Sequence, residues 1–434
     1  MREMKDSGIA WIGVIPQDWE IVRTKSLYCS AKEIAGDRAD DFERLALTLN
    51  GVIKRSKEDS VGLQPEKFSG YQILKKGELV FKLIDLENVA TSRVGLSPYT
   101  GIVSPAYIVL SKQSRAKDLV VRYSMYHFLS MWQREIFNQM GDNGVRSSLN
   151  AKELLNIPHP FPSIYEQKRI VTFLDAQCAE IDAVLEKTRA SIEEYKKLKQ
   201  AVITQAVTKG IRGDRPMKNS GIEWIGDIPE SWEVSSVRYI GQLQNGISKG
   251  GEFFGKGFPF VSYGDVYKNY ELPHSVSGLI DTTEDERATY SVEYGDIFFT
   301  RTSETIEEVG FSCVCKRSIP NATFAGFIIR LRPFCADEKI LTDYAKYYFR
   351  GEHIRAYLVK EMNLVTRASL GQTLLKGMSV IVPPKSVQKE IAEYLDDKCA
   401  DIDALVAKKQ QYLTEIENYK KSLIYEYVTG KKEA

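Results

Sequence analysis

The chain has few of the residues that build disulfide and metal sites. Six cysteines and four histidines occur in 434 residues, which is too few and too scattered for a disulfide framework in a chain of this length. Cys313 and Cys315 have the wrong spacing for a zinc knuckle, and alternating strand positions explain the pair better. We therefore expect reduced thiols and no bound metal.

Long apolar runs and an excess of charge are also missing. No stretch of about 18 uncharged apolar residues occurs, and the N-terminal residues 1–6 have no apolar run after their charges. These absences predict a cytoplasmic protein without a membrane segment. The net charge is +1 at pH 7, and no long segment is strongly basic. A nucleic-acid partner would therefore need a local arrangement of Lys and Arg rather than a bulk field.

Motifs for catalysis are absent as well. The sequence has no Asn/Asp-Pro-Pro-aromatic motif of the kind that holds a flipped adenine, and no Walker-type Gly-Lys-Ser/Thr. The glycine-rich stretch 246–257 lacks the strand, glycine and helix order of a dinucleotide site and is more typical of a mobile surface loop. We also find no convincing nuclease carboxylate cluster. We therefore expect a non-catalytic chain that binds no cofactor.

A long duplication is the main feature that the sequence does contain. Residues 4–20 return as residues 217–233, 213 positions later, with 12 identities in 17 positions. Further matches follow at an offset of 221, such as residues 146–149 with 367–370 and 167–168 with 388–389. The ends of the two copies are alike, whereas their middles, roughly 25–160 and 238–384, have diverged. This pattern indicates one physical task carried out twice on two different targets.

Both middles mix β-branched and aromatic runs with glycine-bounded turns, which is typical of α+β domains. Each also has an amphipathic helix candidate near its end, at residues 119–140 and 340–362.

Each copy closes with a long helix. The first follows the proline-rich residues 158–162 and ends near Gly210, and the second follows Pro383 and Pro384 and stops at Gly430. Steps of three and four between apolar residues predict a coiled-coil seam. The seam residues that we select are Leu174, Ile181, Leu185, Ile192, Ile402, Leu405, Ile416 and Leu423.

A helix of about 40 residues is about 60 Å long and needs a partner for its apolar stripe. Pairing two duplicated units about a pseudo-two-fold axis makes the two helices antiparallel. The alternative, in which each helix packs on its own domain, leaves most of the seam exposed.

The doubled Ser-Gly-Ile-x-Trp-Ile-Gly-x-Ile-Pro-x-x-Trp-Glu segment, the repeated Arg-x-Ser-Leu and the proline-rich helix entries resemble the specificity (S) subunit, HsdS, of type I restriction-modification systems. This resemblance implies two pseudo-symmetric target recognition domains, joined by an antiparallel two-helix coiled coil. It places the first domain at residues 1–163, the first helix at 164–209, the second domain at 210–386, and the second helix with a C-terminal tail at 387–434.

The resemblance also implies the function and the partners. Each domain would read one half of a split, asymmetric double-stranded DNA site, and the coil would dock two methyltransferase subunits and, through them, restriction subunits. S-adenosylmethionine, and ATP with magnesium for restriction, would be bound by those partners. The chain would serve DNA modification and phage defence without being an enzyme itself.

Basic residues beside turns are our candidates for DNA contacts, because arginine pairs bidentately with guanine and hydroxyl side chains bind phosphate. In the middles these residues are Lys54, Arg55, Lys82, Arg93, Lys249 and Arg301. Arg146 with Ser148, and Arg367 with Ser369, recur in both copies, which favours a shared task such as holding phosphate or bracing the helix junction. A solvated surface charge is an equally good explanation for any single residue.

Two other functions stay open from the residues alone. The chain could be the specificity subunit of a stand-alone adenine methyltransferase that has no nuclease. It could also be a coiled-coil scaffold that joins two proteins and never touches DNA, which agrees with its near-neutral charge.

Overall fold

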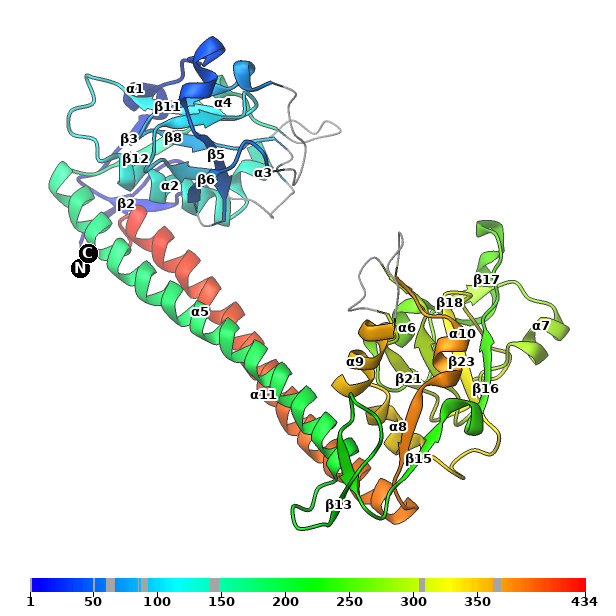
Figure 1. The fold of residues 1–434 in the computed structure, drawn as a ribbon. Helices are drawn as coiled ribbons and strands as arrows, with labels where there is room; N and C mark the ends of the chain where they lie inside the picture. The colour runs from blue at the N-terminus through cyan, green and yellow to red at the C-terminus, as the bar shows by residue number, and fades with distance from the viewer. Residues whose placement is uncertain are drawn as a thin grey trace. The chain divides into compact units, whose positions relative to one another are not determined.

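The computed structural model describes residues 2–49, 51–59, 67–84, 86, 93–140, 148–303, 309–361 and 368–434. The chain forms two compact units, the first made of Met1–Arg189 with Gln411–Ala434 and the second of Ala190–Gln410. Each unit combines one globular part with half of each long helix (Figure 1), whereas the sequence analysis divided the chain at the helix ends. Within the described ranges, no helix is both long and apolar enough to cross a membrane.

The globular part of the first unit contains two four-stranded sheets, in the orders β4–β11–β8–β9 and β6–β5–β10–β7. Only β5 and β10 pair in parallel in these two sheets. The strands are β4 (Tyr28–Cys29), β5 (Arg44–Thr48), β6 (Gly51–Arg55), β7 (Gln72–Leu74), β8 (Leu79–Phe81), β9 (Val94–Leu96), β10 (Gly101–Val103) and β11 (Ile108–Lys112). The two short pairs and the helices are β1 (Met4–Asp6) with β2 (Val14–Pro16), β3 (Glu20–Arg23) with β12 (Pro158–Phe161), α1 (Thr24–Leu27), α2 (Val121–Gln133), α3 (Ile136–Met140) and α4 (Ala151–Asn156).

The globular part of the second unit contains sheets in the orders β16–β23–β19–β21 and β18–β17–β22. Here β17 and β22 form the parallel pair. The strands are β16 (Gly241–Asn245), β17 (Phe254–Val261), β18 (Gly278–Ile280), β19 (Ile297–Thr300), β21 (Ser312–Val314), β22 (Thr323–Phe324) and β23 (Ile328–Pro333). The short pairs and the helices are β13 (Met217–Asn219) with β14 (Asp227–Pro229), β15 (Glu233–Ser236) with β25 (Ser379–Val382), β20 (Thr302–Ser303) with β24 (Ala368–Ser369), α6 (Tyr263–Lys268), α7 (Glu284–Thr289), α8 (Thr342–Tyr348), α9 (Glu352–Glu361) and α10 (Gln372–Gly377).

The two globular parts have related topologies, although the second sheet has four strands in the first unit and three in the second. The sheet β4–β11–β8–β9 corresponds strand for strand to β16–β23–β19–β21, and the second sheet of each part holds one parallel pair. The repeated opening segment forms the same hairpin in both, with Met4 opposite Pro16 and Met217 opposite Pro229. The predicted α+β class with two related units is therefore confirmed.

The two helix candidates in the middles are each broken in the structure. In the first, α2 ends at Gln133 and α3 begins at Ile136. Glu135 lies between them with φ at 57°, and a left-handed residue cannot continue a right-handed helix. In the second, α8 ends at Tyr348 and α9 begins at Glu352. Periodicity alone did not reveal these breaks.

The two long helices are α5 (Ile164–Lys209), with 46 residues, and α11 (Lys385–Val428), with 44 residues. Within each unit they run antiparallel, side by side (Figure 1). In the first unit Lys420 pairs with Asp182 and Arg189 with Glu417, each at 2.6 Å. In the second unit Lys199 pairs with Asp403 at 2.6 Å. The predicted antiparallel pairing of the helices is therefore present in both units.

Most of the selected seam residues lie at the helix interface. Leu405 is the exception, because 44% of it is exposed, and its assignment to the seam is wrong. After the buried Ile402 the seam continues in steps of four, three and four to Leu413, which is 7% exposed, so Leu405 lies one position beside it. The buried predicted residues are Leu174, Leu185, Ile192, Ile402 and Leu423, and the half-buried ones are Ile181 and Ile416.

This correction predicts a difference between two leucines on α11. Leu413→Ala should lower the free energy of unfolding by about 2–5 kcal/mol, because it leaves a cavity in the helix interface. Leu405→Ala should change it by no more than about 0.5 kcal/mol. Urea denaturation of the two variants measures both values, and equal losses would contradict the corrected seam.

The repeated opening segments contact the C-terminal ends of the long helices. Trp19 and Trp232 are both 0% exposed. In the first unit, a Cβ added at Gly430 would lie 3.0 Å from Cη2 of Trp19. In the second unit, a Cβ added at Gly210 would lie 3.3 Å from Cζ2 of Trp232. Both glycines have positive φ, +68° and +81°, so each ends its helix in the conformation that glycine favours.

Two further repeated residues join the globular parts to the long helices. The buried Gln167 accepts a hydrogen bond from the Val120 N–H at 2.8 Å and donates to the Pro162 carbonyl at 2.9 Å. Its counterpart Gln388 makes the same two bonds, from the Leu341 N–H at 2.7 Å and to the Pro383 carbonyl at 2.8 Å. Many of the repeated residues therefore form the frame of each unit.

Candidate nucleic-acid interface

In the first unit, two candidate cations lie on β6 and are held by carboxylates. Lys54 pairs with Glu43 at 2.6 Å, and this hydrogen bond raises the pKa of the Lys54 ammonium. Arg55 pairs with Asp59 at 2.6 Å, and that hydrogen bond raises the pKa of the guanidinium. A DNA phosphate would have to compete with these carboxylates.

The next two candidates lie deeper in the same unit. Lys82 is half-buried. Arg93 is 0% exposed, and its Nη1 donates to the Ile84 carbonyl at 3.3 Å. A fully buried guanidinium offers no surface to DNA, so this burial contradicts the prediction that Arg93 contacts it. Gly95, two residues after Arg93, suggested an exposed turn, but it lies within strand β9, where it is buried.

Lys249, in the glycine-rich stretch of the second unit, is also held inside the fold. Its ammonium pairs with Glu286 at 2.7 Å and donates to the Asp281 carbonyl at 2.9 Å. Only 14% of the side chain is exposed. The hydrogen bond from Lys249 lowers the pKa of the Glu286 carboxyl. These contacts argue against a DNA role for Lys249.

Arg301 and Ser369, by contrast, are brought together by the fold. Thr302 on β20 lies opposite Ser369 on β24, and the Leu370 N–H donates to the Arg301 carbonyl at 2.7 Å. The Arg301 N–H donates to the Phe327 carbonyl at 2.8 Å. Arg301 is half-buried, and its guanidinium has no hydrogen-bond or ion-pair partner among the described residues. An arginine without an internal partner is suited to bind an external acceptor.

Three residues that the sequence analysis missed lie on the same surface. Phe327, next to β23, is 63% exposed. Asn245, at the end of β16, accepts a hydrogen bond on Oδ1 from Nε2 of Gln372, the first residue of α10, at 3.0 Å. Neither amide residue belongs to a sequence motif, so only the fold could reveal them. We call the set Asn245, Arg301, Phe327, Ser369 and Gln372 the Arg301 surface.

The first unit has the same backbone arrangement with a different side chain. Ile84 bridges Ser148 as Thr302 pairs with Ser369, and the Leu149 N–H donates to the Leu83 carbonyl at 2.9 Å. Leu83, which is 1% exposed, therefore occupies the position of Arg301. Ser148 is exposed, as is Ser369. Arg146 and Arg367 lie outside the described residues.

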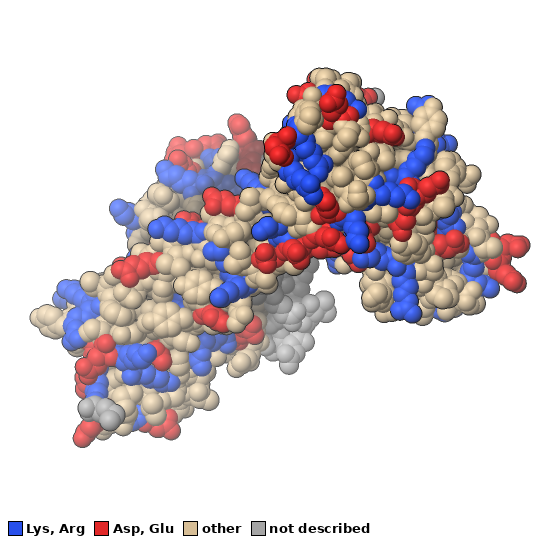
Figure 2. Space-filling model, turned by 90° about the horizontal axis from the view of Figure 1, so that it is seen from below, with Lys and Arg blue, Asp and Glu red and all other residues tan. Residues whose placement is uncertain are grey.

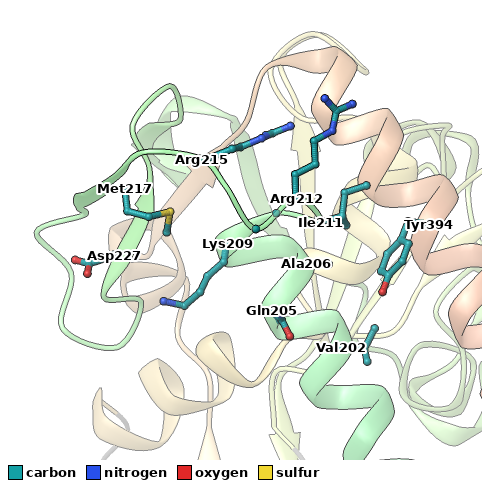
Figure 3. A pocket seen from close by; sticks show the side chains of 12 residues that line it. Val202, Gln205, Ala206, Lys209, Ile211, Arg212, Arg215, Met217, Asp227 and Tyr394 are labelled. Atoms are coloured by element: carbon teal, nitrogen blue, oxygen red, sulfur yellow. The ribbon is translucent and has the colours of Figure 1, made fainter.

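The second unit also contains a hollow of about 400 Å³ at the C-terminal end of α5, whose charged lining residues are Lys209, Arg212, Arg215 and Asp227 (Figure 3). Arg212 pairs with Glu390 at 2.8 Å. Arg215 is the repeat counterpart of Arg2, which pairs with Glu166 and, at 2.7 Å, with Asp18.

The repeat places Ser231 and Val387 where the first unit has Asp18 and Glu166. Arg215 therefore lacks the two carboxylates that hold Arg2. The hollow lies at the end of α5, whereas the Arg301 surface lies at the end of β19, so they are different parts of the second unit.

Charge is mixed on the visible surface. Figure 2 shows Lys and Arg interspersed with Asp and Glu, without a broad field of one sign on the face in view. This agrees with the net charge of +1. A DNA contact must therefore depend on local groups such as Arg301.

Comparison with known proteins points to one family. Residues 229–416 match the sequence profile of the type I restriction modification DNA specificity domain. The MjaVIII specificity subunit of a Methanocaldococcus jannaschii type I restriction enzyme is 24% identical over 426 residues, covering 96% of this chain and 93% of its own length. The EcoKI specificity subunit of Escherichia coli K12 is 24% identical over 325 residues, covering 73% and 67%.

A solved structure shares the fold. One chain of a structure described as showing complex assembly and conformational transition of the type I R-M system has a TM-score of 0.70 and 15% sequence identity, and the match covers 96% of this chain and 99% of that one. The duplicated frame and the paired long helices agree with these likenesses: residues 229–416 match the type I restriction modification DNA specificity domain, and nearly the whole chain is similar to specificity subunits of type I restriction enzymes.

Proposed function

We propose that the chain reads a bipartite, asymmetric site on double-stranded DNA, with one half-site for each unit. The observation that carries this proposal is a shared backbone frame with unlike side chains at one position, Arg301 in one unit and Leu83 in the other. Two readers with the same frame and different surfaces suit two different half-sites. Sequence is read at base edges, whereas phosphate contacts set position.

The long helices supply a spacer in this proposal. A continuous helix of 46 residues is about 69 Å long. Two readers on one face of B-DNA need a spacing of about 34 Å or a multiple of it, and a helix of this length is long enough to span such a spacing. The spacer between the half-sites would then have a fixed length and an unspecified sequence.

Catalysis belongs to partner subunits in this proposal. Two methyltransferase subunits dock on the coil and bind S-adenosylmethionine, and they flip the target adenine out of the duplex. Restriction subunits join through them and use ATP and magnesium. The present chain determines which DNA sequence the complex recognises.

Salt dependence of DNA binding tests the proposal against a scaffold that never touches DNA, which the mixed surface charge favours. For the complex of the full chain with its methyltransferase, the logarithm of the binding constant should fall linearly with that of the salt concentration. The slope should be about −0.9 for each phosphate neutralised. Weak binding with no dependence on salt would support the scaffold.

Arg301→Ala is the informative variant in the same experiment, and its affinity should fall by about 5- to 150-fold. Arg317 is a matched control, because it lies beyond Val314, which pairs with the opposite end of β19 at Ile297. Arg317 is exposed, and Arg317→Ala should bind like the wild type. Equal losses in both variants would indicate a general charge effect.

A further inference from the structure

We infer that Gln372, held by Asn245, reads an adenine in the half-site of the second unit. This inference rests on the proposed function and specifies one base that the second unit recognises. The two amides are joined by the hydrogen bond from Gln372 Nε2 to Asn245 Oδ1, at 3.0 Å. Both side chains are half-buried.

The bond involves one end of the Gln372 amide. Asn245 Oδ1 accepts from Nε2 of Gln372, which leaves Oε1 of Gln372 outside this bond. Gln372 then keeps Oε1 and one N–H of Nε2 available, since no other side-chain partner of Gln372 occurs among the described residues. A free carbonyl oxygen beside a free N–H is the pair that an amide uses against adenine, where it accepts from N6 and donates to N7.

The partial burial of the Gln372 side chain favours specific recognition of a base over a non-specific contact. A glutamine whose stem is packed and whose head is braced loses less side-chain entropy on binding than a free surface glutamine. The bond to Asn245 also restricts the positions that the Gln372 amide can take. Asn245 is therefore a positioning residue, and Gln372 is the residue that contacts the base.

The neighbouring strands place complementary groups beside this amide. Gln372 follows Leu370 by two residues, and the Leu370 N–H bonds to the carbonyl of Arg301. The N–H of Arg301 bonds in turn to the carbonyl of Phe327, which is 63% exposed. An exposed ring suits the thymine methyl group, and a guanidinium without a partner among the described residues suits guanine. The Arg301 surface can therefore read more than one base pair.

The Gln372–Asn245 pair predicts a contact with one particular DNA atom, N7 of an adenine. Replacing adenine by 7-deazaadenine removes the N7 acceptor. With the complex of the full chain and its methyltransferase, this replacement at one adenine of one half-site should weaken binding by about tenfold. Gln372→Ala should weaken binding to unmodified DNA by about 10- to 100-fold and should be insensitive to the modified base at that position.

Two other variants separate reading from folding. Asn245→Ala should lower discrimination at the same base pair and at no other. Gln242 lies exposed on the same strand as Asn245, and Gln242→Ala should bind and discriminate like the wild type. Melting temperatures of the variants within about 2 °C of the wild type would show that the fold is intact. If Gln372→Ala is less stable than that, Gln372→Glu, which keeps the side-chain size, takes its place.

The outcomes are distinguishable. If Gln372→Ala keeps the wild-type response to 7-deazaadenine at every adenine, or loses affinity equally for all sequences, the inference is wrong while the proposed function stands. If the wild-type complex shows no preference for any DNA sequence, the proposed function fails, and the inference fails with it.

Discussion

Exchanging residues 25–160 for the corresponding stretch of a relative with a different specificity should change one half of the recognised DNA site and leave the other half as it was. The exchanged stretch contains both four-stranded sheets of the first unit. The exchange keeps β1, β2 and the contact of Trp19 with Gly430, so the frame should still form. Mapping the methylated sites of the chimaeric complex measures the result.

The reciprocal exchange is the control for this experiment. Replacing residues 238–384, which include the Arg301 surface, should change the other half-site only. If either chimaera changed both halves or neither, while still folded and active, one reader for each half-site could not be correct.

Replacing Trp232 by alanine should lower the free energy of unfolding of the second unit by about 3–5 kcal/mol. The side chain is 0% exposed and packs beside Gly210 at the end of α5, so its removal leaves a cavity where the opening segment contacts the helix. Trp19→Ala should have the same effect on the first unit, next to Gly430.

Urea denaturation with a probe for each unit can measure these losses separately, because two compact units need not unfold in one step. Val234, on β15 in the second unit, is 42% exposed, and Val234→Ala is the control that should change stability by no more than about 0.5 kcal/mol. A loss below about 1 kcal/mol for Trp232→Ala would contradict an anchoring role for the repeated segment.

The shared frame of the two units could be predicted from the sequence because the duplicated segments reveal which residues form it. Two copies of one segment imply two copies of one packing arrangement, and Trp19 and Trp232 have the same buried environment. The long helices were predictable from their proline entries and glycine ends, and α5 ends at Lys209, directly before Gly210. Leu405 was misassigned because a stepping pattern alone cannot fix which of two neighbouring apolar positions faces the partner helix.

The candidate interface was less predictable, since a basic residue beside a turn can face inward. Arg93 and Lys249 satisfy their charges inside the fold, through a carbonyl and a carboxylate, and no local pattern distinguishes them from Arg301. Asn245 and Gln372 are 127 positions apart in the chain. The pairing of β16 with β23 and of β20 with β24 helps to bring their two segments to one surface.

Mapping the methylated adenines in the genome of a host that carries this chain and its methyltransferase tests the central claim most directly. Two unlike readers on a repeated frame predict one asymmetric motif with two specified parts, separated by a fixed number of unspecified bases. A continuous motif, a symmetric one, or a spacer of variable length would contradict the claim.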